Sequence, residues 1–175
     1  CALPIYGWLN TDFMKTSSYT PKLIQYSKYY KTFSNVLRVR TVSAEYLIVM
    51  KLMAGRQYKN DLSDVVGILL EQQNNGKKIH LDDIKRVADE LYGGYDKIPE
   101  SSRIFIEATY QNLDLEELYK KIREEERQNK DILLEFQDHY PEVLNGDNLA
   151  DILKAAKARK NATLPPLDAY ADHNV

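Results

Sequence analysis

Cysteine is almost absent from this chain of 175 residues, and the single one, Cys1, cannot form a disulfide bond within the chain. This cysteine use is compatible with a reducing compartment, so we expect a cytoplasmic protein. The first residues lack the basic flank and apolar core of a signal peptide. The longest apolar stretch is interrupted by Lys51 and is too short to span a bilayer. We therefore expect no membrane partner.

An excess of charge of one sign is also lacking, since 24 Lys and Arg stand against 26 Asp and Glu and the net charge is −2. This balance predicts no strong attraction to nucleic acid or to an anionic membrane. A basic run, Lys154–Lys160, ends the last predicted helix, where cations favour the helix dipole, and nucleic-acid contact there is the weaker alternative. The length and a hydrophobic content of 43% suit one domain, or one small domain with a helical extension.

An initiator methionine is missing, and the first residues offer neither a helix cap nor a hydrophobic period. One reading frame of a common sequencing-library adapter also encodes Cys-Ala-Leu-Pro-Ile. We therefore expect residues 1–6 to be a non-native start and native sequence to begin near Tyr6 or Gly7, with an upstream part missing.

Hydrophobic periodicity predicts two strands within a mostly helical chain. The strands, Tyr29–Phe33 and Val36–Arg40, are aromatic or β-branched, and Ser34-Asn35 between them suits a hairpin turn. Capping and helix-breaking residues delimit predicted helices over residues 21–28, 44–54, 59–73, 81–92, 99–110, 114–140 and 148–160. The tail, residues 161–175, is predicted to be disordered.

The long helix over residues 114–140 has apolar residues on one side near both ends, but its middle third, Arg123–Lys130, is fully polar. We expect this middle third to face solvent, with packing only at the helix ends. Glu126–Lys130 and two similar pairs are oriented for i, i+4 ion pairing, worth about 0.3–0.5 kcal/mol each.

The most informative segment runs from Val39 to Leu70. Between Tyr46 and Ala54 every residue except Lys51 is apolar, so this helix should be buried around most of its circumference. An unpaired buried ammonium is too costly to remain charged, so Lys51 either extends to water along its alkyl chain or meets an anion. The first alternative is a common structural arrangement, whereas the second indicates a site for a phosphate or a carboxylate.

Asp61 and Asp64 follow in the next helix, and their i, i+3 spacing places them on one helical face. A carboxylate at the start of a helix bonds to the free amides there and interacts favourably with the helix dipole. This capping role accounts for one of the two aspartates. The other faces Lys51 and the basic residues of the turn, Arg56 and Lys59; Arg56 could form a bidentate bond to Asp64 or to a phosphate. A structural ion-pair network and a ligand-binding site both fit this pattern.

These residues also resemble a known family, the prokaryotic nucleotidyltransferase-like proteins related to AbiEii-type toxins and, more distantly, to minimal nucleotidyltransferases. The motifs similar to the end of that catalytic domain are Ala44-Glu45-Tyr46-Leu47, Lys51-Leu52-Met53-Ala54-Gly55-Arg56 and Asp61-Leu62-Ser63-Asp64. The resemblance extends over about residues 7–110. One departure is that the basic residue that often directly precedes the aspartate is displaced to Lys59.

The resemblance implies an α/β fold, with residues 7–76 as the C-terminal part of a nucleotidyltransferase-like mixed sheet with helices and residues 77–160 as a mostly helical extension. It implies that the intact protein transfers a nucleoside monophosphate from a nucleoside triphosphate to an acceptor hydroxyl. Lys51 matches the lysine that contacts the triphosphate, and Asp61 matches a catalytic aspartate that orients Lys51 or the acceptor. Arg56, Lys59 and Asp64 would be further substrate-binding residues.

The metal-binding motifs of that family are absent, because neither a Gly-Ser dipeptide nor an Asp-x-Asp pair occurs in the 175 residues. Such carboxylates hold the metal ions that align and neutralise the transferring phosphoryl group. We therefore expect Mg²⁺ and its ligands in an upstream part of the intact protein, no metal or cofactor bound by this chain, and no activity of this chain alone. The alternative is a non-catalytic binding module of the same fold, whose helices after Leu81 form an interface for a protein partner, as in a toxin–antitoxin pair.

Overall fold

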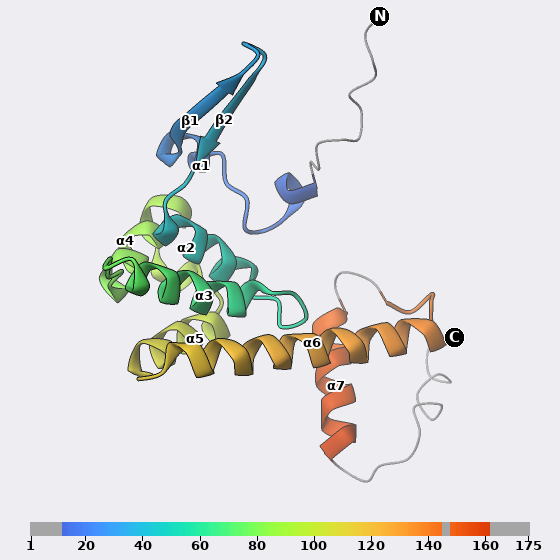
Figure 1. Cartoon of the computed structure of the whole chain (residues 1–175). Coiled ribbons are helices and arrows are strands. Elements are labelled where there is room, and N and C mark those ends of the chain that lie inside the picture. The colour runs from blue at the N-terminus through green and yellow to red at the C-terminus, as the bar shows by residue number, and fades with distance from the viewer. Residues whose placement is uncertain (1–11, 145–147, 162–175) are drawn as a thin grey trace, which may run out of the picture.

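The computed structural model describes residues 12–144 and 148–161, so the predicted non-native start and all of the predicted tail except Asn161 lie outside the described residues. The described chain is mostly helical with one small antiparallel sheet, which supports the α/β prediction in this coarse sense (Figure 1). In chain order the elements are η1 (Asp12–Lys15), α1 (Lys22–Tyr26), β1 (Lys28–Phe33), β2 (Leu37–Thr41), α2 (Ala44–Ala54), α3 (Asp61–Asn74), α4 (Leu81–Tyr92), η2 (Tyr95–Lys97), α5 (Glu100–Gln111), α6 (Leu115–His139) and α7 (Leu149–Asn161).

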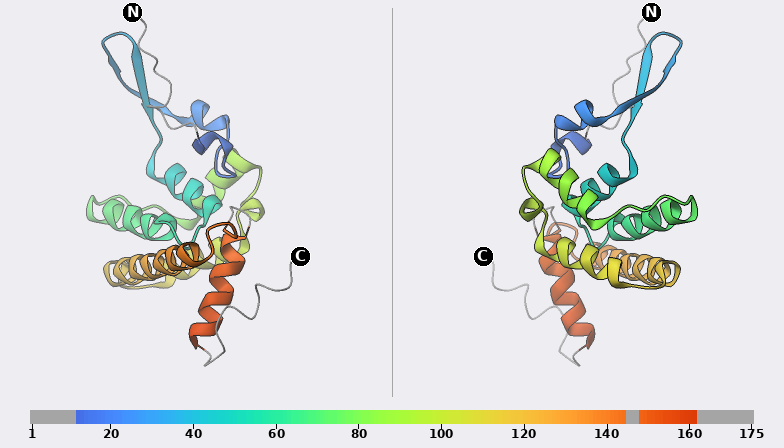
Figure 2. Two further views of the ribbon diagram at one scale, coloured as in Figure 1. Left: turned by 90° about the vertical axis from the view of Figure 1, so that its right-hand side faces the viewer. Right: turned by 90° about the vertical axis from the view of Figure 1, so that its left-hand side faces the viewer.

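Strands β1 and β2 form an antiparallel hairpin that extends away from the helices (Figure 1, Figure 2). Its turn has left-handed backbone at Ser34, with φ of 49°, and at Asn35, with φ of 54°. This conformation matches the right-handed twist of the strands, and it confirms the hairpin predicted from Ser34-Asn35. The register shifts between Tyr29 and Lys31, so Tyr30 lies at a bulge.

The hydrophobic core lies among α2, α3, α4 and α5. Helix α2 is buried on most of its surface, as its sequence predicts, and Ile48, Val49 and Leu52 are inaccessible to solvent. They pack with buried residues of the neighbouring segments, which are Val65, Leu69, Ile84, Val87, Ala88, Leu91, Ile98 and Ile106. Helices on both sides of residue 76 therefore share one core.

The prediction that α6 packs only at its ends is wrong, although most residues of its middle third are exposed. Glu126 and Asn129 are buried there, and α6 packs along α3 (Figure 1). Glu126 bonds to the start of α3 instead of pairing with Lys130. The two polar side chains continue the apolar series of Ile122 and Leu133 at the same spacing of three and four residues, so the contact surface of α6 is continuous.

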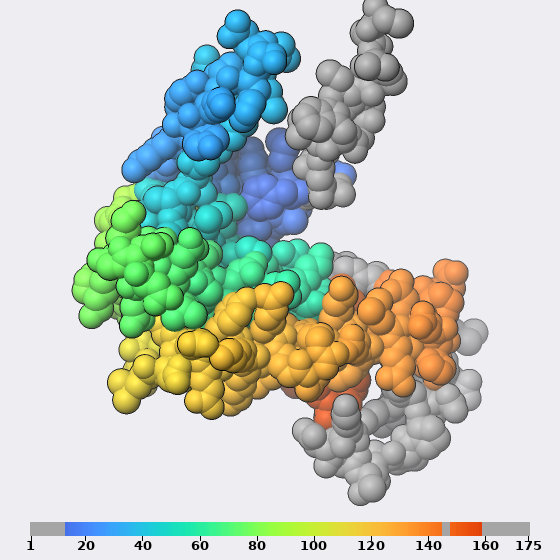
Figure 3. All heavy atoms as spheres, viewed as in Figure 1, coloured from blue at the N-terminus to red at the C-terminus, as the bar shows by residue number. Residues whose placement is uncertain are grey.

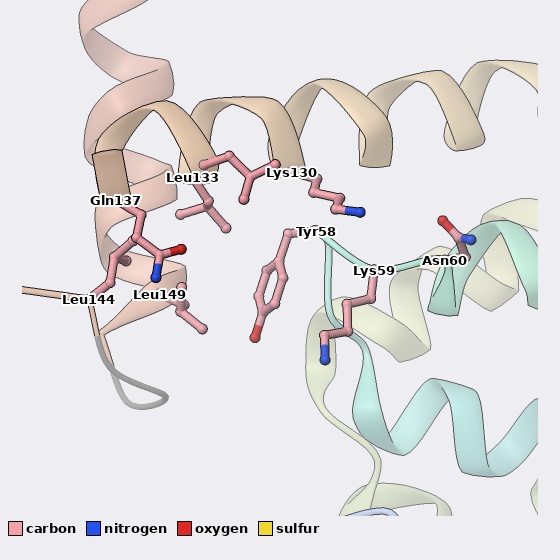
Figure 4. A pocket seen from close by; sticks show the side chains of 9 residues that line it. Tyr58, Lys59, Asn60, Lys130, Leu133, Gln137, Leu144 and Leu149 are labelled. Carbon is pink, nitrogen blue, oxygen red and sulfur yellow. The ribbon is translucent and has the colours of Figure 1, made fainter. Parts of the chain in front are cut away.

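Helix α7 packs against α6, with Leu153 and Leu133 both buried. The loop between α2 and α3 lies beside α6 and the start of α7, and residues of all three line one cavity (Figure 4). Among residues 12–144 and 148–161, none of the helices combines the length and the apolar character that crossing a membrane requires.

Candidate functional site

The site lies where α2 turns into α3. Gly55 ends α2 in a left-handed conformation, with φ of 53°, and its amide donates to the carbonyl of Lys51 at 2.8 Å. Such a C-cap satisfies a carbonyl at the helix end and turns the chain sharply. The two helices then pack against each other, so that Lys51 near the end of α2 faces Asp61 at the start of α3.

The ammonium of Lys51 contacts both aspartates that the sequence singled out. Its Nζ lies 3.1 Å from Oδ1 of Asp61 and 2.7 Å from Oδ2 of Asp64. The side chain of Lys51 is 35% exposed, so its alkyl stem follows the edge of the core while the ammonium approaches the surface. Both alternatives considered for Lys51 thus apply, because the amine reaches the molecular edge and also meets anions.

Arg56 pairs with Asp61 rather than with Asp64, which differs from the expectation. Its Nε lies 2.7 Å from Oδ2 of Asp61, its Nη2 donates to Oδ1 at 3.3 Å, and its backbone amide donates to Oδ2 at 3.4 Å. The side chain of Asp61 is only 1% exposed. As the first residue of α3, Asp61 is next to the turn that carries Arg56, whereas Asp64 begins the following turn of the helix. Asp61 is therefore a buried carboxylate enclosed by two cations.

The pairing favours the charged forms of Asp61, Lys51 and Arg56. Burial raises the pKa of Asp61, but hydrogen bonds from Arg56 and Lys51 outweigh burial, and the pKa lies below its ordinary value. Burial lowers the pKa of Lys51, but its bonds to Asp64 and Asp61 outweigh burial and raise it. Hydrogen bonding to Asp61 likewise raises the pKa of Arg56. Two cations and two carboxylates thus form one neutral group between α2 and α3.

A residue that the sequence did not single out, Glu126 of α6, supports the other side of this turn. Its Oε1 accepts from the backbone amide of Leu62 at 2.8 Å, and its Oε2 accepts from that of Ser63 at 3.3 Å. These amides belong to the first turn of α3, and Asn60, the N-cap residue, makes no side-chain capping bond. Burial raises the pKa of Glu126 despite these hydrogen bonds. The spacing of Glu126 from Ile122 and Leu133 was the signal that could have identified it.

Lys59 lies apart from this network. The loop that carries it borders a cavity of about 540 Å³ lined by Tyr58, Lys59 and Lys130 and by leucines of α6 and of the segment that follows, Leu133, Leu134, Leu144 and Leu149 (Figure 4). Within the part of the chain that the structure describes, the side chain of Lys59 forms no ion pair with Asp61 or Asp64. Of the predicted site residues, the structure therefore brings together Lys51, Arg56, Asp61 and Asp64 but not Lys59.

The site does not fit a divalent metal ion. Among the described residues, no group of three or more His, Cys, Asp or Glu side chains is placed to hold a metal. The two carboxylates of the site are already paired with Lys51 or Arg56. A metal ion would have to displace an ammonium or a guanidinium from them, and Mg²⁺ prefers a nearly octahedral set of oxygen ligands.

In comparisons with models of protein families, with curated proteins and with solved structures, nothing matches this chain. The nucleotidyltransferase-like resemblance therefore stays a prediction made from the residues themselves.

Proposed function

We propose that Lys51 binds phosphate in a nucleotidyltransferase of which this chain forms a C-terminal part. The intact protein would transfer a nucleoside monophosphate from a nucleoside triphosphate to an acceptor hydroxyl. The observation that carries this proposal is the Lys51 ammonium, held between Asp61 and Asp64 at the edge of an otherwise apolar helix. The motifs around Lys51 and Asp61 that resemble the AbiEii-related family support the same conclusion.

The arrangement leaves Lys51 able to bind a further anion. An ammonium has three N–H donors, and Asp61 and Asp64 accept from two of them. Asp64 is 40% exposed, so the outer side of its pair with Lys51 opens to solvent. In this proposal Asp61, fixed by Arg56, orients Lys51, and a phosphate oxygen takes the third donor or competes with Asp64 for the ammonium.

Metal ions commonly neutralise the transferring phosphoryl group in such reactions. Because neither the Gly-Ser dipeptide nor the Asp-x-Asp pair of the resembling family occurs in the sequence, the proposal places the Mg²⁺ ligands in an upstream part of the intact protein. This chain would then supply phosphate binding and orientation but no transfer by itself.

The experiment compares variants of the intact protein incubated with each of the four nucleoside triphosphates labelled at the α-phosphate. We expect Lys51→Ala to abolish label transfer while the protein stays folded, because the phosphate contact is lost. Lys130→Ala is the matched control, since Lys130 is a lysine of α6 outside the network and should transfer label normally. Unchanged transfer by a folded Lys51→Ala protein would contradict the proposal.

A non-catalytic binding module of the same fold is the second candidate function. The observation that favours it is that the two cations and two carboxylates of the site already neutralise one another. In that case Lys51→Ala lowers only the stability, and the intact protein binds none of the four nucleotides. Saturable nucleotide binding that is lost in Lys51→Ala but kept in Lys130→Ala favours the nucleotidyltransferase instead.

A further inference from the structure

The hairpin of β1 and β2, residues 28–41, is exposed to solvent and contributes no residue to the core. It extends beyond the helices in all three views (Figure 1, Figure 2), and the space-filling view shows it as a separate projection (Figure 3). Aromatic side chains are exposed along it, with Tyr29 at 58% and Tyr30 at 64%. Large exposed rings on a projecting element commonly mark a binding surface.

The charge of this region differs from that of the whole chain. From Phe13 to Ala44 the sequence has six Lys and Arg and no Asp or Glu, whereas 18 Lys and Arg stand against 26 Asp and Glu elsewhere. The net charge of −2 is therefore the sum of +6 for this segment and −8 for the rest of the chain. Four of these cations lie on the hairpin, and within the described structure none of them pairs with a carboxylate: Lys28, Lys31, Arg38 and Arg40.

One face of the hairpin combines guanidinium groups with a tyrosine ring. The register places Arg40 opposite Tyr29 and Arg38 opposite Thr32, and the hydroxyl of Tyr29 donates to that of Thr32 at 3.1 Å. Arg40 donates to the hydroxyl and carbonyl oxygens of Ser27 at 2.7 and 2.5 Å. These bonds hold the base of the hairpin in place. Arg38, which is further along β2, is exposed to solvent.

The opposite face carries a cation beside an aromatic ring. Lys31 lies opposite Val39, and Phe33 lies opposite Leu37. The Lys31 ammonium is 5.0 Å from the centre of the Phe33 ring. Each face of the hairpin therefore carries an aromatic ring together with at least one cation, and the hairpin has no acidic residue.

We propose that this hairpin binds single-stranded nucleic acid. Lys28, Lys31 and Arg38 would contact phosphates, because such contacts release counterions and do not require a particular sequence. The exposed rings of Tyr29 and Tyr30 would stack on unpaired bases. Single strands fit better than a duplex, since the bases of a duplex offer their edges in the grooves and not their faces. This inference is independent of phosphate binding at Lys51.

The experiment measures the fluorescence anisotropy of labelled oligo(U) and oligo(dT) of about 16 nucleotides, titrated with the chain at about 50 mM salt. We expect Lys31→Ala/Arg38→Ala to weaken binding at least tenfold and to reduce the salt slope by about 1.4, since single strands contribute about 0.7 per phosphate contact. The matched control, Lys154→Ala/Lys157→Ala, removes two lysines from α7, of which Lys154 is exposed and Lys157 half-buried, and should change affinity less than twofold. Circular dichroism checks that both variants keep their helices.

A second pair of measurements separates nucleic acid from other polyanions. Tyr29→Ala/Tyr30→Ala should weaken oligo(U) binding about tenfold, because base stacking is lost, and should leave heparin binding unchanged. The proposal is overturned if the unaltered chain binds neither oligonucleotide. It is also overturned if the α7 variant weakens binding as much as the hairpin variant, or if the tyrosine variant leaves oligonucleotide affinity unchanged. In the last case the hairpin is a site for acidic protein segments or other polyanions without bases.

Discussion

Glu126 of α6 accepts a hydrogen bond of 2.8 Å from the backbone amide of Leu62, which lies 64 positions earlier in the chain. Together with the bond from the amide of Ser63, it provides the cap that Asn60 does not give to α3. Since Asp61 is the first residue of α3, the position of its carboxylate depends on α6. The helix that follows the core thus contributes directly to the geometry of the candidate site.

The first prediction concerns this cap. Glu126→Gln should lower the free energy of unfolding by about 1–3 kcal/mol, because a glutamine amide can accept from one backbone amide but turns a donor toward the other. Urea denaturation at neutral pH measures the change. The control is Glu125→Gln, an exposed neighbour on the same helix. Equal losses of unfolding free energy in the two variants would show that Glu126 does not stabilise the start of α3.

The second prediction compares the two aspartates of the site. Asp61→Asn should destabilise the protein by about 3 kcal/mol, because it leaves Arg56 without its buried partner and removes one of two from Lys51. Asp64→Asn should cost at most about 1 kcal/mol, because the Asp64 side chain is 40% exposed and solvent screens its pair with Lys51. Denaturant titration of both variants tests the order, and a larger loss for Asp64→Asn would refute it.

The third prediction is a pH dependence that follows from the lowered pKa of Asp61. Above the unfolded value, about 3.9, the carboxylate is charged in both states and its full contribution to stability is present. As the pH falls further, the unfolded state binds the proton first, so the contribution declines until the pH has passed the folded pKa. The difference in unfolding free energy between the unaltered chain and Asp61→Asn should thus be constant from pH 7 to about 5 and shrink below about pH 4. A difference that grows on acidification would contradict this assignment.

Local patterns predicted the parts of the structure that depend on neighbouring residues. The hairpin follows from Ser34-Asn35, and α4 runs from Leu81 to Tyr92 as predicted, because a glycine directly after it ends the helix. The approach of Lys51 to Asp61 and Asp64 follows from spacing around one turn. These features need only capping rules and helical periodicity.

Tertiary contacts determined the features that local patterns could not predict. The sequence places Glu126 in a stretch predicted to face solvent, because a polar side chain in a contact surface is recognised only with its partner, here the free amides of α3. The choice of Arg56 between two aspartates depends on how the loop leaves Gly55, which periodicity does not describe. The basic character of the turn predicts Lys59 at the site, but Lys59 borders the cavity that Lys130 also lines (Figure 4).

The fourth prediction tests the turn that positions the network. Gly55 has φ of 53°, and a Cβ added there would lie 2.5 Å from Oγ of Ser102 and 3.2 Å from the carbonyl oxygen of Leu52. Gly76 also has a left-handed backbone, with φ of 69°, but an added Cβ would meet nothing within 4 Å. Gly76→Ala should therefore cost about 1 kcal/mol from backbone strain alone.

Gly55→Ala should cost about 2–4 kcal/mol, because the same strain is joined by a clash with the hydroxyl of the buried Ser102. A backbone movement that relieves this clash would shift Arg56, the next residue, and so weaken its bidentate contact with Asp61. In the double variant with Asp61→Asn, the loss should be smaller than the sum of the two single losses, because both changes disrupt the same contact. Denaturant titration of the single and double variants measures this coupling. Strictly additive losses would mean that the turn at Gly55 does not hold Arg56 against Asp61.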